Sequence, residues 1–295
     1  MTRLVDKTRG QAWGLLTPML LIMVGVTAWP LARTIWLSLT SATIGGDPAQ
    51  WVALDNYLDA IRNPDFHAAL GRTLYFTLAT VAMELVLGLL VGLMLNQPFK
   101  GRTVARALLV LPWALPTIVN AMMWRLIDGP EYGALNALLF QSGLIADYRS
   151  WLGDPSVAIE MVILADVWKN YPFVALIVLA ALQTVPEDLY EAARLDGANA
   201  WTRFLNVTLP GILGPLSVAI VLRIIEAFKV FDLVYVMTKG GPLDATKPVS
   251  FVVYQEAFSY LRIGSGAAYA ILMAGFSACL IGGYIFLLRK QESAA

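Results

Sequence analysis

The stretch EAARLDGANAWTRFLNVTLP, from Glu191 to Pro210, joins two long apolar runs, Val157 to Leu182 and Leu209 to Phe228. Its charged residues would be costly inside lipid. Each flanking run is long enough to cross a bilayer as a helix, which takes about 20 mostly apolar residues. The sequence around this stretch therefore predicts two membrane spans joined by a polar loop.

The whole composition agrees with a membrane protein. Of 295 residues, 58% are hydrophobic and only 14% are charged, whereas about a quarter of the residues of soluble domains are charged. Six runs meet the length requirement for a spanning helix: Trp13 to Leu39, Thr73 to Leu95, Ala107 to Ile127, Val157 to Leu182, Leu209 to Phe228 and Ala267 to Leu288. We predict an all-α, polytopic membrane protein with six transmembrane helices.

The distribution of Lys and Arg predicts which side of the membrane each connection faces. Cytoplasmic flanks carry an excess of these residues, and they occur here as Arg3, Lys7, Arg9, Lys100, Arg102, Arg106, Arg289 and Lys290. Six spans put both termini on one side, so we expect cytoplasmic N- and C-termini and a cytoplasmic loop at 184–210. The first run is longer than the 7–15 residues of a signal-peptide core and is predicted to remain as a span.

Several functions are excluded or disfavoured by single residues. Cys279 is the only cysteine and His67 the only histidine, which argues against metal clusters and Ser/His/Asp chemistry. No GxxxxGK[ST] loop is present, so the chain has no phosphate loop of its own. A net charge of zero gives no sign of nucleic acid. We expect no directly bound cofactor, no metal and no enzymatic activity.

The chain is predicted to form a single transmembrane domain over 1–295, because it contains no low-complexity segment or flexible linker. Pro112 and Pro116 interrupt the third apolar run. Each proline removes a backbone donor and kinks a helix. We therefore expect a kinked third span.

The loop at 184–210 contains start and stop signals for a short helix. Thr184 and Glu187 fit a capping box, and Gly197 suits the left-handed conformation that ends a helix. A second short helix, ANAWTRFLN, is expected before a helix-breaking Leu209-Pro210. The first helix either docks on a cytoplasmic partner or lies in the membrane interface as an amphipathic segment.

A resemblance to a known family distinguishes these two roles. EAARLDG, followed after nine residues by Val-Thr-Leu-Pro, resembles the EAA loop of binding-protein-dependent ABC importer permeases, from which Val207 departs mildly. Further stretches resemble the sugar-transporting branch, with its maltose-type and glycerol-3-phosphate-type permeases. These are LDNY (54–57), LPWALP (111–116), VWKNYPF (167–173), VPEDLYEAA (185–193), AFKVFDLVYVMTKGGP (227–242) and GSGAAYA (264–270). Arg72 stands where this family usually has Asn.

The resemblance implies a type I ABC importer permease fold with a cytoplasmic coupling helix, located in a bacterial or archaeal cytoplasmic membrane. It also implies partners: a second homologous permease forming a heterodimer, two ATP-binding cassette subunits that hold ATP and Mg, and a periplasmic or lipid-anchored solute-binding protein.

The resemblance further assigns roles in the coupling loop. Glu191 is expected to hold the helix against a groove of the ATPase, Ala192 and Ala193 to provide its close-packed face, and Gly197 to keep the turn rigid. Asp196 belongs to the same coupling set.

Two helical stripes are candidates for the substrate pathway. Arg223, Glu226, Ala227 and Val230 follow i, i+3, i+4, i+7 spacing, and Lys169, Asn170 and Phe173 cluster in the fourth run. The resemblance implies sugar contacts there, and Phe173 and Trp168 are candidates for the flat apolar surface that a sugar ring needs. The alternative is that Arg223 pairs with Glu226, or Lys169 with Asp166, to fix helix packing. Glu84 and Asn120 are expected to form hydrogen bonds between helices.

The main functional hypothesis is the permease subunit of an ATP-driven sugar importer. A proton-coupled secondary transporter, with Glu84, Asp166 or Glu226 carrying the proton, is the alternative and would predict inverted repeats. An intramembrane enzyme has too few nucleophilic or metal-binding groups. Within the importer class, a sugar phosphate such as glycerol-3-phosphate stays possible. An uncharged sugar is preferred, because Glu226 would repel an anion on the same face.

Overall fold

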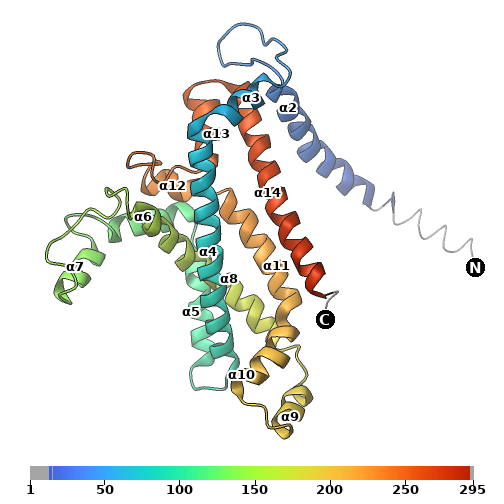
Figure 1. Ribbon diagram of the computed structural model, residues 1–295, viewed down its shortest axis with the longest axis vertical. Helices are drawn as coiled ribbons and strands as arrows, with labels where there is room; N and C mark the ends of the chain where they lie inside the picture. The colour runs from blue at the N-terminus through green and yellow to red at the C-terminus, as the bar shows by residue number, and fades with distance from the viewer. Residues whose placement is uncertain (1–12, 15, 293–295) are drawn as a thin grey trace, which may run out of the picture. The chain divides into compact units, whose positions relative to one another are not determined.

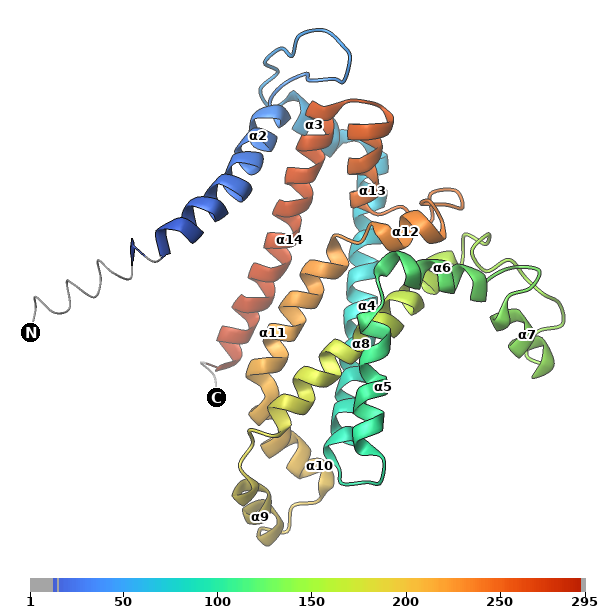
Figure 2. The ribbon, with the colours of Figure 1, turned by 180° about the vertical axis from the view of Figure 1, so that it is seen from behind.

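The computed structural model describes residues 13–14 and 16–292, and this part of the chain consists of helices and their connections (Figure 1 and Figure 2). Arg3, Lys7 and Arg9 lie outside the described residues. The helices are η1 (Val24–Ala28), α2 (Trp29–Ser38), α3 (Asp55–Arg62), α4 (Pro64–Asn96), α5 (Arg102–Ala114), α6 (Thr117–Ile127), α7 (Ala134–Gln141), α8 (Ala158–Leu182), α9 (Glu187–Leu195), α10 (Ala200–Arg203), η2 (Phe204–Thr208), α11 (Leu209–Phe228), α12 (Asp232–Met237), α13 (Val249–Tyr254), η3 (Gln255–Ser259) and α14 (Ile263–Glu292).

The helices bear out most of the predicted spans. Among the described residues, five helices are long and apolar enough to cross a membrane, and a sixth candidate consists of two helices at a sharp bend. Helix α8 begins one residue after the predicted fourth run, and α11 has the bounds of the predicted fifth run. Helix α4 has 33 residues and extends beyond the predicted second run at its N-terminal end.

The third predicted run is not one kinked helix but two helices, α5 and α6, that meet at 94°. The break lies at Leu115, whose ψ of 136° is extended, and at Pro116. A proline disfavours the α conformation of the residue before it, which explains an extended Leu115. Pro112, by contrast, stays inside α5. The two prolines therefore act differently: only the second ends a helix.

The chain divides into two compact units. Unit 1 falls within residues 1–64 and 252–274, and unit 2 within 65–251 and 275–295. In unit 1 the side-chain amide of Asn56 donates to the carbonyl oxygens of Ser38 and Thr40 at 2.8 and 2.9 Å. The Gly264 amide donates to the Ala42 carbonyl at 2.9 Å. The expectation of a single domain stays a prediction.

The core of unit 2 depends on close contact between α4 and α8. A Cβ atom at Gly88 would lie 2.6 Å from Val174 Cβ, and one at Gly92 would lie 2.7 Å from Val178 Cγ1. The two glycines form a Gly-x-x-x-Gly pair, which allows helix backbones to approach closely in membranes. Since nothing larger than hydrogen fits at these positions, the pair sets the spacing of α4 and α8.

One carboxyl group after α6 is buried without compensation. Asp128 is 1% exposed, and neither carboxyl oxygen has a hydrogen-bond partner within the described part of the chain. Burial raises the pKa of Asp128 from its ordinary value of 3.8 to about 6. Because the folded state then binds its proton more tightly than the unfolded state, the free energy of unfolding falls as pH rises through this interval.

We predict that Gly88→Ala lowers the free energy of unfolding by about 1–3 kcal/mol, because the new methyl group overpacks the contact with Val174. Thermal unfolding of the detergent-solubilised chain measures this. Gly71→Ala, in the same helix, is the control, since its Cβ meets nothing within 4 Å. Equal stability of both variants would contradict the assigned role of Gly88.

We predict that Asp128→Asn stabilises the chain at pH 7 by up to about 3 kcal/mol, the free-energy equivalent of the pKa shift. The advantage over the wild type should shrink as pH falls from 7 and disappear only at about pH 3 and below, where Asp128 is mostly protonated in both states. Unfolding curves across this range test it, with exposed Asp147→Asn as control. A difference independent of pH would show that ionisation of Asp128 is not the cause.

Candidate functional site

Three charged side chains from three different helices meet inside unit 2. Arg223 of α11 donates from Nε to Glu84 Oε2 at 2.6 Å and from Nη2 to Glu84 Oε1 at 2.9 Å. The same Nη2 donates to Asp166 Oδ2 of α8 at 3.1 Å. The Asn170 side-chain amide completes the group by donating to Asp166 Oδ1 at 3.0 Å. We call these four residues the charge cluster.

The charge cluster is almost inaccessible to solvent. The Glu84 and Arg223 side chains are 0% and 7% exposed, and that of Asp166 is 11% exposed. Charges at such depth are tolerated only when each is paired and hydrogen-bonded. Arg223 is both paired and hydrogen-bonded, because two nitrogens of its guanidinium group donate to the carboxylate of Glu84. The cluster therefore fixes how α4, α8 and α11 lie against one another.

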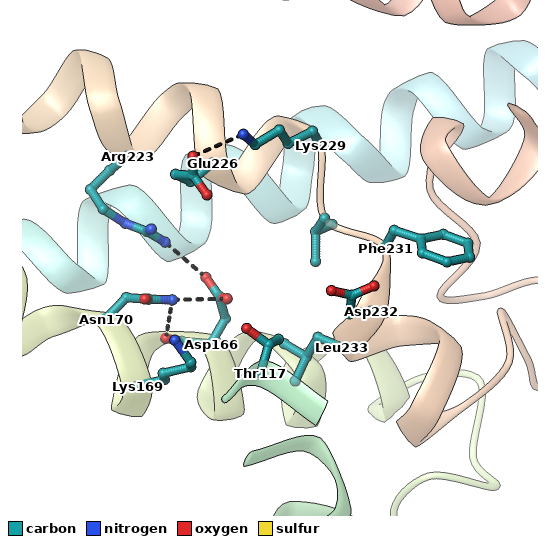
Figure 3. A pocket seen from close by; sticks show the side chains of 11 residues that line it. Thr117, Asp166, Lys169, Asn170, Arg223, Glu226, Lys229, Phe231, Asp232 and Leu233 are labelled. Atoms are coloured by element: carbon teal, nitrogen blue, oxygen red, sulfur yellow. Dashed lines mark hydrogen bonds and ion pairs between the residues drawn. The ribbon is translucent and has the colours of Figure 1, made fainter. Parts of the chain in front are cut away.

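Three members of the charge cluster, Asp166, Asn170 and Arg223, form one wall of a pocket of about 280 Å³, shown in Figure 3 and here called the central pocket. Helices α6, α8, α11 and α12 and the break between α11 and α12 supply its lining. The lining residues are Thr117, Asp166, Lys169, Asn170, Arg223, Glu226, Lys229, Val230, Phe231, Asp232 and Leu233. The cations Lys169, Arg223 and Lys229 balance the anions Asp166, Glu226 and Asp232, so the lining carries no net charge.

A second hollow of about 340 Å³ adjoins the central pocket and shares Lys169, Asn170, Arg223 and Glu226 with it. It adds the aromatic rings of Trp113 and Phe173, which stack with centroids 6.0 Å apart and an angle of 27°. The two hollows together place an aromatic surface beside amide and charged groups. Such a combination suits a ligand with apolar faces and many hydroxyl groups.

The structure brings most of the predicted pathway residues together. Lys169, Asn170, Phe173, Arg223 and Glu226 line one or both hollows, and Val230 lines the central pocket. Their contact with a substrate stays a prediction.

Ala227 differs from the expected helical stripe: it is 2% exposed and packs in the hydrophobic core. Helix α11 ends at Phe228, so Val230 lies beyond it, and a face defined by helical spacing cannot include that residue.

The ion pairs differ from the sequence alternatives. Arg223 pairs with Glu84 and Asp166 rather than with Glu226, which pairs with Lys229 at 2.9 Å. Lys169 has no ion-pair partner in the described ranges. Residue spacing reveals only neighbours on the same helix. It could not reveal that Arg223 pairs with Glu84, because Glu84 lies on a different helix, α4.

Other expectations for the spans have mixed outcomes. The Asn120 amide donates to the Ala165 carbonyl at 3.2 Å, which confirms a hydrogen bond between helices. Trp168, a candidate for the aromatic surface, packs instead edge-on against Trp124. Trp113 takes that role; its place between the two prolines of the third run was the available signal.

The first helix predicted in the loop at 184–210 is present as α9 and ends just before Gly197, as expected; its coupling role stays a prediction. Gly197 has φ +78°, and its amide donates to the Arg194 carbonyl at 3.0 Å. The Ala198 amide donates to the Ala193 carbonyl at 2.9 Å. These two bonds form a Schellman motif. The glycine at 197 is thus required by the backbone, because a side chain there would be strained.

The start of α9 corrects the predicted capping box. Its N-terminal flanking residue is Pro186, with no side-chain cap. The Thr184 hydroxyl instead donates to the Ala181 carbonyl at 2.8 Å, because Thr184 still belongs to the turn that ends α8. Glu187, the other member of the expected box, is the first residue of α9.

Leu209-Pro210 does not break the helix, contrary to the prediction. Residues 200–228 form one continuous candidate span. The π-helical segment η2 precedes Leu209, and Pro210 falls in the first turn of α11. The helix therefore passes the proline without ending, because Pro210 follows a π-helical turn and lies where α11 begins.

The coupling loop presents its predicted residues outward. Glu191, Ala192, Asp196 and Gly197 are exposed and Ala193 is half-buried. The Tyr190 hydroxyl of α9 donates to Thr208 Oγ1 at 3.1 Å, which links the helix to the root of α11.

Comparison with known proteins agrees with this geometry. The sequence profile of the family described as binding-protein-dependent transport system inner membrane component matches residues 84–292. The trehalose/maltose transport system permease protein of Thermococcus litoralis is 39% identical over 261 residues, 88% of this chain and 86% of that protein. The sulfoquinovosyl glycerol transport system permease protein of Agrobacterium fabrum is 34% identical over 279 residues, 94% and 90% of the two chains.

Solved structures share the fold. A bacterial ABC transporter involved in the import of the acidic polysaccharide alginate has a chain that superimposes with a TM-score of 0.82 at 22% identity, covering 98% of this chain and 99% of that one. The alginate transporter in complex with a pentasaccharide-bound periplasmic protein gives 0.83 at 20% identity, covering 96% of each chain. The predicted polytopic, all-helical importer permease fold is thereby confirmed.

We predict that Arg223→Met lowers the free energy of unfolding by about 3–5 kcal/mol, because it leaves Glu84 and Asp166 buried without a counter-ion. Glu84→Met should also destabilise, and the double variant should lose less than the sum of the two single losses. Thermal unfolding in detergent measures all three. Lys229→Met, at an exposed pair, should cost less than about 1 kcal/mol; strict additivity at 84 and 223 would contradict the coupling.

Proposed function

The chain belongs to the family of binding-protein-dependent transport system inner membrane components, and from this premise we propose that it forms part of the path by which an ATP-driven importer moves a carbohydrate inward. As a member of this family it is the multi-pass permease of an ABC importer, and ATP hydrolysis is not its own activity. We assign it to the cytoplasmic membrane, with both termini on the cytoplasmic side.

The proposal includes the remaining subunits. A second, homologous permease would complete the path, and two ATP-binding cassette subunits would bind ATP and Mg. A solute-binding protein would deliver the substrate from outside. A chain of the same fold occurs in the bacterial alginate ABC transporter, whose structure was solved in complex with an alginate pentasaccharide-bound periplasmic protein.

Coupling to the ATPase is proposed to pass through α9. The Glu191 carboxylate projects from an exposed helix and makes no hydrogen bond or ion pair within the described residues. Ala192 and Ala193 beside it leave room for close approach of another surface. The Schellman turn at Gly197 and the Tyr190–Thr208 hydrogen bond make the loop stiff enough to pass motion to α11.

The central pocket and the second hollow beside it are together the observation that carries the carbohydrate assignment. The stacked Trp113 and Phe173 rings offer a flat surface to a sugar ring, and Asn170 and Thr117 offer polar groups to its hydroxyls. Since the cations and anions of the lining balance, an uncharged sugar fits better than a sugar phosphate. From the sequence alone, an uncharged sugar is preferred because Glu226 would repel an anion. The ion pair with Lys229 partly neutralises Glu226, so the preference for an uncharged sugar now depends on the charge balance of the whole lining.

We predict that Glu191→Lys abolishes substrate-stimulated ATP hydrolysis, because it reverses the charge on the proposed docking face. The chain is co-expressed with the products of neighbouring genes, and the purified complex is reconstituted in liposomes with its solute-binding protein. A panel of neutral sugars, uronates and sugar phosphates is then tested for stimulation of ATP hydrolysis.

Asp188→Lys, the same reversal in the first turn of α9, is the matched control and should keep most of the stimulation. Stimulation by one neutral sugar, lost only with Glu191→Lys, supports the full proposal. Uptake by the chain alone, driven by a proton gradient without any ATPase, would overturn it in favour of a secondary transporter. Stimulation by a sugar phosphate alone would agree with the importer function but contradict the proposal of an uncharged substrate.

A further inference from the structure

A groove separate from the central pocket lies beside the coupling loop. It has a volume of about 730 Å³ and lies between the C-terminal part of α4, helix α9 and the segment α10–η2. Figure 1 shows α9 and α10 at the same end of unit 2 as the connection between α4 and α5. Its lining includes Leu89, Leu90, Leu93, Arg194, Trp201 and Arg203.

One side of this groove is apolar and continues along a span. Leu90 is 58% exposed, and the exposed side chains of Val86 and Met94 on α4 extend the same apolar surface. Trp201 is 67% exposed and stacks on Phe204 with ring centroids 5.6 Å apart. Exposed tryptophan next to a span is typical of the headgroup level of a bilayer. In a bilayer, these features would place the groove between the hydrocarbon region and the headgroup level.

The other side of the groove is cationic. Arg194 of α9 and Arg203 of α10 both line it, and no Asp or Glu is among its lining residues. Arg194 is exposed and has no ion-pair partner in the described part of the chain. One nitrogen of Arg203 donates to the Ala198 carbonyl at 3.2 Å, which fixes the guanidinium and leaves its other donors for a ligand. Two arginines facing one groove suit a phosphate group.

We propose that this groove binds an anionic phospholipid, with the phosphate between Arg194 and Arg203 and an acyl chain along Leu89, Leu90 and Leu93. A water-soluble anion would use the arginines but not the apolar wall. A neutral lipid would use the wall but leave two cations without a counter-charge. Basic pockets beside spans on the cytoplasmic side are suited to anionic headgroups.

Such a lipid would act on the coupling loop. Arg194 lies in the last turn of α9, and Arg203 ends α10, so one phosphate joins the two helices that flank the turn at Gly197. The bound lipid would hold α9 at a fixed position relative to α11. Binding itself depends only on the groove in a membrane, whereas this effect on coupling rests on the proposed function.

The test measures lipid retained by the full-length chain, purified with any subunits that accompany it. Protein is reconstituted in nanodiscs of phosphatidylcholine with a minor share of phosphatidylglycerol, then extracted into mild detergent, and the bound lipid is quantified by mass spectrometry. The wild type should keep about one phosphatidylglycerol per chain, in excess of its share in the bilayer. Arg194→Gln combined with Arg203→Gln should lose this lipid.

Two further variants make the result specific. Leu90→Trp fills the groove from an exposed position and should also lose the lipid, even if Arg203→Gln disturbs α10. Lys100→Gln combined with Arg102→Gln removes the same charge from the connection between α4 and α5, outside the groove, and should retain it.

Equal loss in the control pair would reduce the effect to general surface charge and overturn the proposal. Unchanged retention in both groove variants would overturn it as well. So would a cross-link from Leu90→Cys to another protein subunit in native membranes, since a protein would then occupy the groove.

Discussion

The structure of unit 2 depends on the burial of one guanidinium between two carboxylates. Taking such charges out of water costs several kcal/mol for each ion, and the cost is offset only while Arg223 keeps both Glu84 and Asp166 within hydrogen-bond distance. Because the three residues belong to α11, α4 and α8, the charge cluster requires these helices to converge at one level. A shift of any of them exposes an unpaired charge to an apolar interior.

Other features follow from this convergence. Helices α4 and α8 can approach closely enough only because Gly88 and Gly92 lack side chains. The break at Pro116 turns α6 away from α5, so that Thr117 and Trp113 both reach the space beside the cluster. The central pocket is therefore a product of helix packing, and its polar wall is the exposed edge of the same ion pairs that stabilise the packing.

The sequence predicted what depends on local composition. Apolar runs located α8 and α11 to within one residue. Gly197 marked the end of α9, because the backbone there adopts the left-handed conformation, which glycine reaches without strain. It did not predict the partner of Arg223, since 139 residues separate it from Glu84. The pattern also misjudged Leu209-Pro210, because a π-helical turn absorbs the proline without ending the helix. Glycines four residues apart in an apolar run were a readable signal for the α4–α8 contact.

We propose that the wall formed by Asp166, Asn170 and Arg223, with the Trp113–Phe173 pair beside it, faces the substrate during transport. The most direct test is a structure of the assembled importer, trapped with its stimulating sugar and a non-hydrolysable ATP analogue. We expect a sugar ring against Phe173 with a hydroxyl near Asn170, and an intact Arg223–Glu84 ion pair. Sugar density confined to the second permease, with these side chains packed against protein, would contradict it.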